Sequence, residues 1–252
     1  MRCMVLLSSL VLTTACSAQA PSPRCTPLPL EDVRLTAGPL KQAQDKDAEY
    51  LLQLEPDRML AFLRKRAGLE PKAKGYDGWD GDGRNLTGHI CGHYLSAVSI
   101  MFAATGDNRF KERADYIVDQ LDEVQKKNGN GYLGALEGGQ EMFAQVAKGE
   151  IRSGGFDLNG QWAPFYTLHK MYAGLRDAYR FAGNKKALQL EIGFAAWCET
   201  ILKDLNNEQI QKMLNTEFGG MNEVFVDLYK DTGDARWLKM SWVGRGVPSS
   251  ST

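Results

Sequence analysis

One pattern of apolar and polar positions occurs three times along the chain. Each copy has an apolar helical stretch, a short break centred on glycine, and a second stretch in which apolar residues recur at helical spacing. Glycine accepts the left-handed conformation that ends helices, and the Asp or Asn after it can cap the next helix. We therefore predict three helical hairpins. Their first helices cover 93–104, 169–181 and 222–229, the breaks centre on Gly106, Gly183 and Gly233, and the second helices cover 109–121, 185–202 and residues from 235 onward.

The spacing of these hairpins favours one fold class. The breaks are unevenly spaced and further apart than the period of about 33–34 residues in tetratricopeptide or ankyrin arrays. Variable loops between hairpins are typical of an α/α toroid, in which one set of helices lines the inside and the other forms the outer wall. One more helix is expected over 45–66, and strand signals are almost absent. We predict an all-α fold, an incomplete (α/α)6 toroid made of about three helical hairpins over 31–242.

The start of the chain has a different character. Residues 1–20 combine a basic start, a short apolar run and small residues suited to cleavage, which predicts a secretory signal peptide. Residues 13–16 form a weak lipoprotein box, so lipidation of Cys16 is one alternative and a misassigned start codon is another. The prolines of 21–30 predict a stiff linker. We expect an exported protein that is periplasmic, extracellular or held at the outer membrane as a lipoprotein.

The end of the chain departs from the repeat. Residues 243–252 are rich in glycine, proline and serine, which do not continue the helix that precedes them. We interpret them as a non-native tail that follows a frameshift or a false stop, and expect a truncated domain of about half a ring. A natural flexible C-terminus is the alternative.

Composition and charge exclude one class of function. Apolar residues make up 43% of the chain and charged residues 24%, as in an ordinary globular protein. The formal net charge is -1, and no basic stripe offers the counterion release on which nucleic-acid binding depends, so nucleic acid is not expected as a partner. Of the five cysteines, Cys91 and Cys198 fall in the folded part, where we predict two buried side chains and no disulfide framework.

Polar and aromatic residues gather just before, or at the start of, the first helix of each hairpin. Because equivalent ends of the inner helices meet at one mouth of a toroid, these clusters should face a common cavity. All three histidines of the chain lie in them. Aromatic rings can stack on sugar rings, and His, Asn and Glu side chains can bind hydroxyl groups. The candidate substrate-binding residues are His89, His93, Trp162, Tyr166, His169, Glu217, Asn222 and Glu223.

Several of these candidates have a structural interpretation as well. Trp79 and Tyr132 offer further flat faces, but burial in the core is the commoner place for any single aromatic residue. His89 and His93 share one helix face, which makes them a weak zinc candidate. Ile90 stands where a metalloprotease motif needs glutamate, and no third ligand is close in the sequence, so no metal site is expected.

Carboxylates are a second class of candidate. Hydrolysis of a glycosidic bond commonly needs two carboxylates that flank it. Asp80, Glu137, Glu217 and Glu223 are available, and the sequence alone does not pair them. Stabilising the start of its own helix through the helix dipole is an equally good role for Glu223.

Taken together, these motifs resemble the N-terminal half of β-L-arabinofuranosidase-type enzymes, glycoside hydrolase family 127 and its close relative family 146. The resemblance covers about 33–242, in the family's order. It rests on LTAGPL at 35–40, YLLQLEPDR at 50–58, GHICGHYLSA at 88–97, YTLHK at 166–170 and TEFGGMNE at 216–223.

The resemblance implies an (α/α)6 toroid followed by β-sandwich modules, and removal of β-linked L-arabinofuranose from plant-derived glycans. It also implies a zinc-bound cysteine nucleophile, held with further cysteines and a glutamate, and a second glutamate as acid/base. In the family these residues lie further along than Trp242, and neither Cys91 nor Cys198 falls at a matching motif. We therefore expect no catalytic residue and no bound zinc in this chain, which should be inactive alone. The matching motifs, with His89, His93, His169 and 217–223, should form the cavity wall.

Two other functions stay open at this point. Three histidines in a toroid also suit proton transfer, as in sugar epimerisation. Outside enzymes, a helical-repeat glycan-binding protein without hydrolytic activity is the alternative. In the leading interpretation, the partner is an oligosaccharide or polysaccharide that contains L-arabinose. The sequence gives no oligomeric state.

Overall fold

The computed structural model describes residues 27–217 and 220–243. The predicted signal peptide, Cys16, the first part of the linker and the tail from 244 onward lie outside the described residues, so the expectations about them stay predictions. Within the described part, no helix is both long and apolar enough to cross a membrane. The helices are α1 (Pro39–Gln53), α2 (Pro56–Arg66), α3 (His89–Thr105), α4 (Asn108–Asn128), α5 (Gly139–Ala147), α6 (Pro164–Ala182), α7 (Lys185–Leu202), α8 (Asn207–Leu214), α9 (Gly220–Thr232) and α10 (Ala235–Val243), with short 3-10 turns η1 (Leu30–Asp32) and η2 (Gly78–Asp80).

The three predicted hairpins are confirmed as α3/α4, α6/α7 and α9/α10. Gly106, Gly183 and Gly233 stand at the breaks with φ of 74°, 68° and 74°, the left-handed conformation expected of them. The residue after each glycine caps the second helix through its side-chain oxygen, as predicted. Asp107 accepts from the backbone N–H of Arg109 at 3.0 Å, Asn184 from that of Ala187 at 3.1 Å, and Asp234 from that of Arg236 at 2.9 Å.

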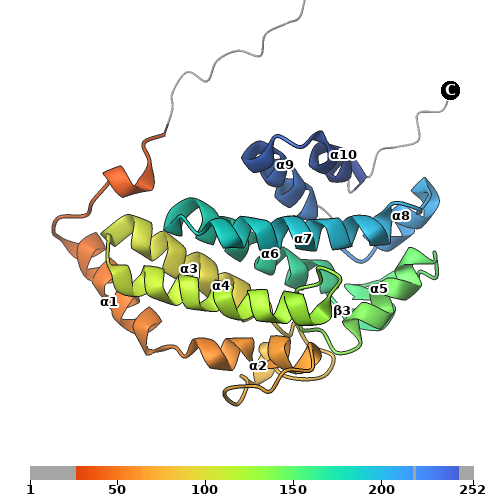
Figure 1. The fold of residues 1–252 in the computed structure, drawn as a ribbon, viewed down its shortest axis with the longest axis horizontal. Helices are drawn as coiled ribbons and strands as arrows, with labels where there is room; N and C mark the ends of the chain where they lie inside the picture. Colours follow the sequence, from red (N-terminus) through yellow and green to blue (C-terminus); the bar gives the residue numbers. More distant parts are fainter. Residues whose placement is uncertain (1–26, 218–219, 244–252) are drawn as a thin grey trace, which may run out of the picture.

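The hairpins pack side by side as two layers of helices (Figure 1). The first helices follow one another in space, because α6 contacts both α3 and α9. The second helices α4 and α7 contact each other and the first helices that precede them. This is the inner and outer arrangement of a toroid, so the predicted all-α, toroid-like fold class is confirmed.

The backbones of α3 and α6 touch where the two helices cross. A Cβ atom at Gly92 would overlap the carbonyl oxygen of Lys170, and one at Gly174 would lie 2.6 Å from the carbonyl oxygen of Gly92. A packed interior leaves no room for such an atom, so both positions need glycine. The close crossing sets His93 of α3 beside Tyr166 of α6, with 3.2 Å between Nε2 of the imidazole and the phenol oxygen.

The helix expected over 45–66 is in fact two helices, α1 and α2. The backbone leaves the helical conformation at Leu54 (ψ 145°) and Glu55 (ψ 108°), directly before Pro56. Proline disfavours the helical conformation in the residue before it and is well suited to the first position of a helix, which is where Pro56 stands. The single-helix prediction was wrong because it gave this proline no weight.

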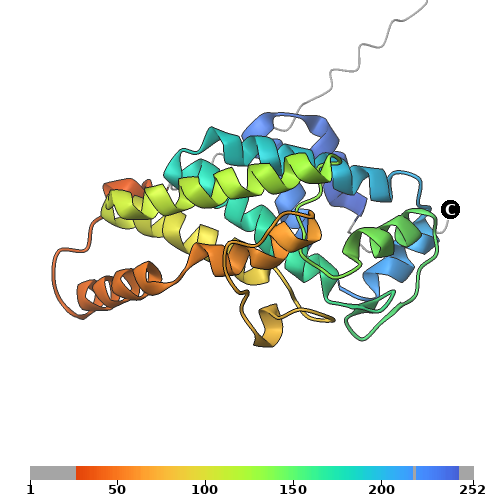
Figure 2. The ribbon, with the colours of Figure 1, turned by 60° about the horizontal axis from the view of Figure 1, so that its bottom comes forward.

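The sequence analysis also missed α5, α8 and a small antiparallel sheet. The sheet has strand order β1 (Ser153–Gly154), β2 (Asp157–Leu158), β3 (Gln161–Trp162), with Ser153 opposite Leu158 and Asp157 opposite Trp162. Strands of two residues are too short to show the alternation by which strands are recognised. Helix α8 carries a signal that was readable, a capping box between Asn206 and Gln209. Figure 2 shows α5, the segment of the sheet and α8 together at one end of the helical layers.

Aromatic side chains fill the space between the hairpins. Tyr172 stacks on Phe194 with 4.3 Å between ring centroids, and Tyr132 lies 4.7 Å from Trp197 by the same measure. Tyr132 is 1% exposed. It therefore belongs to the core, and the idea that its face meets a sugar is wrong.

Candidate functional site

Three aromatic side chains meet at the N-terminal ends of α3 and α6. His89 opens α3 and His93 follows one turn later, with 5.8 Å between the ring centroids. Tyr166 lies in the first turn of α6, 5.9 Å from the His89 ring centroid, and its hydroxyl lies 3.2 Å from Nε2 of His93. The fold thus brings together three predicted site residues that come from two separate clusters of the sequence.

The buried carboxylate of Asp80 fixes the start of α3. Its Oδ1 accepts a hydrogen bond of 2.8 Å from the backbone N–H of Gly88, at the end of the helix where the dipole favours negative charge. Nδ1 of His89 lies 2.7 Å from the carbonyl oxygen of Leu86. Because a carbonyl only accepts, Nδ1 carries a proton. The orientation of the His89 ring is therefore fixed, and Asp80 acts as a cap.

Glu217 fixes the start of α6 in a similar way. Its two carboxylate oxygens accept hydrogen bonds of 3.0 Å each, from the backbone N–H groups of Phe165 and Tyr166. Burial raises the pKa of this carboxyl, and the two N–H groups oppose the shift. This candidate for acid/base chemistry is therefore engaged in holding the helix that carries Tyr166.

Replacing Glu217 by alanine is expected to lower the free energy of unfolding by about 2 kcal/mol, because two partly buried N–H groups lose their acceptors. Glu217→Gln keeps one acceptor oxygen and should cost less. Urea denaturation of both variants measures the difference, with Glu112→Ala on the exposed face of α4 as the control. An alanine variant at position 217 as stable as the wild type would contradict the capping role.

A cavity of about 580 Å³ lies beside this cluster, between α6 and the helices α7 to α10. Four predicted site residues line it: Tyr166, His169, Glu217 and Asn222. Most of its other lining residues are apolar, and they include Phe156, Leu202, Met213, Leu214, Phe225 and Met240. Tyr166 faces both the cavity and His93, so it joins the two halves of the site.

Two histidines of the candidate site are weaker bases than a free imidazole. Partial burial lowers the pKa of His93 and of His169, and the ammonium group of Lys170 lowers both further. Glu223 opposes the shift at His169. Both rings are therefore neutral near pH 7, where each offers one hydrogen-bond donor and one acceptor. That pair of functions matches the hydroxyl group of a sugar.

Lys170 is a site residue that the predicted set lacks. Its ammonium group lies 4.7 Å from the centroid of the Tyr166 ring, a cation–π contact. The signal was present in the sequence, since residues four apart in a helix share one face. Lys170 also lines the cavity.

The remaining predicted residues have different placements. Trp162 of β3 pairs with Trp79 of η2, with ring centroids 5.9 Å apart, and neither is among the residues that line the cavity. Asn222 lines the cavity, but its amide nitrogen donates to the carbonyl oxygen of Ser241 at 2.8 Å and so joins α9 to α10. Glu223 is exposed in the first turn of α9, a position that fits its structural interpretation as a charge at the helix start.

A zinc-thiolate centre does not fit the described residues. Cys91 and Cys198 are both buried and free, and burial raises the pKa of each thiol, that of Cys198 to about 12. Zinc sites in proteins use three or four protein ligands that lie close together. Over 27–217 and 220–243, no three His, Cys, Asp or Glu side chains are grouped so that they could hold a metal ion.

Comparison with known proteins adds the family context. Residues 32–243 match the family described as the β-L-arabinofuranosidase GH127 catalytic domain. No curated protein matches the chain. Among solved structures, a GH127 β-L-arabinofuranosidase from Geobacillus stearothermophilus T6 is similar over 81% of this chain, with a TM-score of 0.57 and 16% sequence identity. This chain spans 31% of that protein's length.

Proposed function

We propose a function on one premise: the chain belongs to the catalytic-domain family of GH127 β-L-arabinofuranosidases. Membership indicates a glycoside hydrolase domain and a carbohydrate ligand. The finer proposal is that residues of α3 and α6, with the start of α9, form the wall of a pocket for β-linked L-arabinofuranose. The ligand is then an oligosaccharide or polysaccharide that contains L-arabinose.

The observation that carries the proposal is the contact between His93 and Tyr166 beside the cavity. The imidazoles of His89, His93 and His169 and the phenol of Tyr166 supply hydrogen-bonding groups, and the helices that carry them have capped starts. The flat ring faces and the apolar lining of the cavity suit the C–H face of a sugar. Preformed, mixed surfaces of this kind bind small polar ligands without a large ordering cost.

We further propose that the described residues bind the glycan and do not cleave it. Both thiols are buried and protonated, and Glu217 is engaged by two backbone N–H groups. The same engagement favours the second candidate, a glycan-binding protein without hydrolytic activity. The zinc and nucleophile that the family resemblance implies are assigned to no residue of this chain, and export through residues 1–20 remains part of the proposal.

The test is calorimetric titration of the full chain with a β-L-arabinofuranose disaccharide, together with an assay for released L-arabinose. We expect binding without release. Tyr166→Phe and His93→Ala should each weaken binding by about five- to tenfold, because a hydrogen bond to a hydroxyl is worth about 1 to 1.5 kcal/mol.

Tyr50→Phe is the matched control, since Tyr50 is 59% exposed on α1 and belongs to no part of the site. A chain that binds no arabinofuranoside, or one whose affinity is unchanged by Tyr166→Phe, would overturn the binding proposal. Release of arabinose by the wild type would overturn the proposal that these residues only bind.

A further inference from the structure

We propose that Trp79 and Trp162 form a second sugar-binding position, which takes a neighbouring ring of the glycan bound at His93 and Tyr166. This second position rests on the proposed function, and it predicts that the chain binds oligosaccharides more tightly than single sugars. The two tryptophans are not among the residues that line the cavity, so they form a separate surface.

The tryptophan pair consists of an exposed ring, Trp79, in contact with a half-buried ring, Trp162. The ring centroids of Trp79 and Trp162 are 5.9 Å apart and the ring planes meet at 86°, an edge-to-face arrangement. Trp79 is 69% exposed, more than any other aromatic side chain among the described residues. An edge-to-face contact covers one face of one of the two rings and leaves the opposite face of that ring and both faces of the other ring uncovered by the pair. A ring face is the part that stacks on a sugar.

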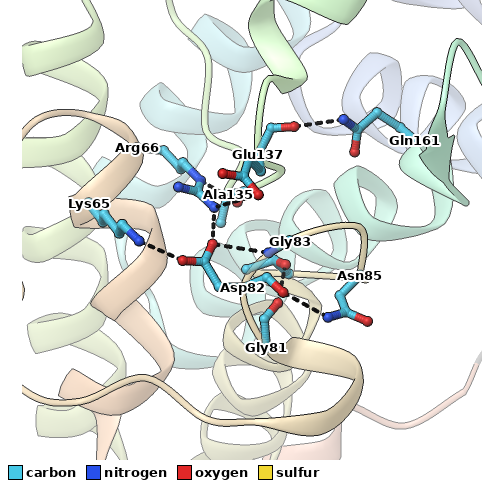
Figure 3. A network of polar contacts seen from close by, with 10 residues as sticks. Lys65, Arg66, Gly81, Asp82, Gly83, Asn85, Ala135, Glu137 and Gln161 are labelled. Atoms are coloured by element: carbon cyan, nitrogen blue, oxygen red, sulfur yellow. Dashed lines mark hydrogen bonds and ion pairs between the residues drawn. The ribbon is translucent and has the colours of Figure 1, made fainter.

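The loop that carries Trp79 is held rigidly from several sides. The backbone oxygen of Trp79 accepts from the N–H of Leu86 at 2.9 Å, and the next residue, Asp80, is the buried cap of α3. The carboxylate of Asp82 pairs with Lys65 and Arg66 of α2 (Figure 3). An exposed ring on a rigid loop loses little freedom when it binds, which favours affinity.

The two loops are also joined to each other. Arg84, in the Trp79 loop, donates to the carbonyl oxygen of Gly160 at 3.0 Å and to the carboxylate of Asp157 at 2.7 Å, both in the segment that carries Trp162. Gln161 donates to the backbone oxygen of Glu137 at 2.6 Å, which adds a third loop to the network (Figure 3). The distance between the two rings is therefore set by a network of polar contacts and not by the rings alone.

The pair lies at the end of the helices where the proposed pocket lies. The Trp79 loop runs through Asp80 directly into α3, whose first residue is His89, and Trp162 stands just before α6, whose first turn holds Tyr166. One short glycan can therefore contact both places.

The charges around the pair favour a neutral ligand. Asp82 is paired with Lys65 and Arg66, and Asp157 with Arg84. Because these charged groups are paired with one another, the ring faces are the groups left to contact a ligand. A sugar ring with an apolar C–H face is the ligand class that such a surface takes.

The experiment titrates the full chain with L-arabinose and with arabino-oligosaccharides of increasing length, for the wild type, Trp79→Ala and Trp79→Phe. Trp79→Ala should weaken binding of the longer oligosaccharides by about tenfold and leave the affinity for L-arabinose unchanged. Trp79→Phe, which restores a ring face, should recover most of the lost affinity. Tyr50→Ala, an exposed aromatic residue on α1, is the matched control.

The outcomes separate the two proposals. If the wild type binds oligosaccharides and Trp79→Ala binds them equally well, the second position is overturned and the proposed function stands. If Trp79→Ala weakens L-arabinose and oligosaccharides alike, the tryptophans are not a separate position. If the wild type binds no arabino-oligosaccharide, both proposals fall. A thermal melt of each variant shows whether it is folded, and an unfolded alanine variant would overturn the claim that the exposed ring serves binding and not the fold.

Discussion

Replacing Gly92 by alanine is expected to lower the free energy of unfolding by about 3 kcal/mol. The added Cβ atom would overlap the carbonyl oxygen of Lys170 in α6. The obstacle is backbone and not the end of a flexible side chain, so α3 and α6 have to move apart as whole helices. Guanidinium denaturation of the variant and the wild type measures the loss.

A second result should accompany the loss of stability. Moving α3 away from α6 separates His93 from Tyr166, so the Gly92→Ala variant should also bind an arabinofuranoside more weakly. Gly193→Ala in the middle of α7 is the comparison, because the three atoms nearest to its added Cβ belong to the side-chain amide of Gln125 and not to the backbone. This amide donates to the carbonyl oxygens of Gly131 and Leu190, so moving it offsets part of the gain of about 1 kcal/mol in helix propensity. Gly193→Ala should therefore lose much less stability than Gly92→Ala. Equal stability of the wild type and the Gly92→Ala variant would show that the helices do not cross as closely as described.

The hairpins were predictable because their signals are local. Gly183 and Asn184 determine the end of one helix and the start of the next through their own backbone and side chain, and the same holds at the other two breaks. The position of Gly92 gave no such signal. In the sequence it is one small residue in an apolar helix, and its importance comes from Lys170 in a helix far along the chain.

That several candidate residues lie together was predictable, and their individual contacts were less so. The repeat placed His93 and Tyr166 at equivalent helix ends, and the structure brings them into contact. The role of Glu217 was not readable, because its partners are backbone N–H groups at the start of α6. Trp79 was undecided between core and surface, since one aromatic residue in a loop looks the same in either place.

A buried carboxyl group in α7 is another feature that the sequence pattern did not predict. Glu191 falls in the regular helical pattern of α7, yet its side chain is fully buried and neither carboxylate oxygen has a hydrogen-bond partner among the described residues. Burial raises its pKa to about 8. The carboxylate of Asp231 adds to the shift and Arg176 opposes it, with further contributions from Asp227 and Asp177. At neutral pH the group is therefore largely protonated in the folded protein.

This raised pKa makes the protein less stable as pH rises. In the unfolded chain the carboxyl group has a pKa near 4.3. Between that value and about 8 the folded state binds more protons than the unfolded state, so the free energy of unfolding falls as protons are removed. The stabilising contribution of Glu191 is fully present below about pH 4 and is lost by about pH 8. At about 1.4 kcal/mol per pKa unit, the free energy of unfolding falls by roughly 5 kcal/mol over this range. His93 and His169 act in the opposite sense, because their pKa values are lowered on folding.

The free energy of unfolding of Glu191→Gln is therefore expected to fall by several kcal/mol less than that of the wild type between pH 5 and pH 8, because a neutral amide cannot ionise. Urea denaturation at pH 5 and pH 8 measures the change in the free energy of unfolding for the wild type and for the variant. The difference between these two changes is the contribution of Glu191, because the contributions of His93 and His169 are the same in both proteins. Glu112→Gln, on the exposed face of α4, should leave the pH dependence unchanged. If the wild type and Glu191→Gln lose the same amount of stability between pH 5 and pH 8, then Glu191 is not held protonated in the folded protein. Its carboxyl group would then not be buried beside the carboxylates of α9 in solution.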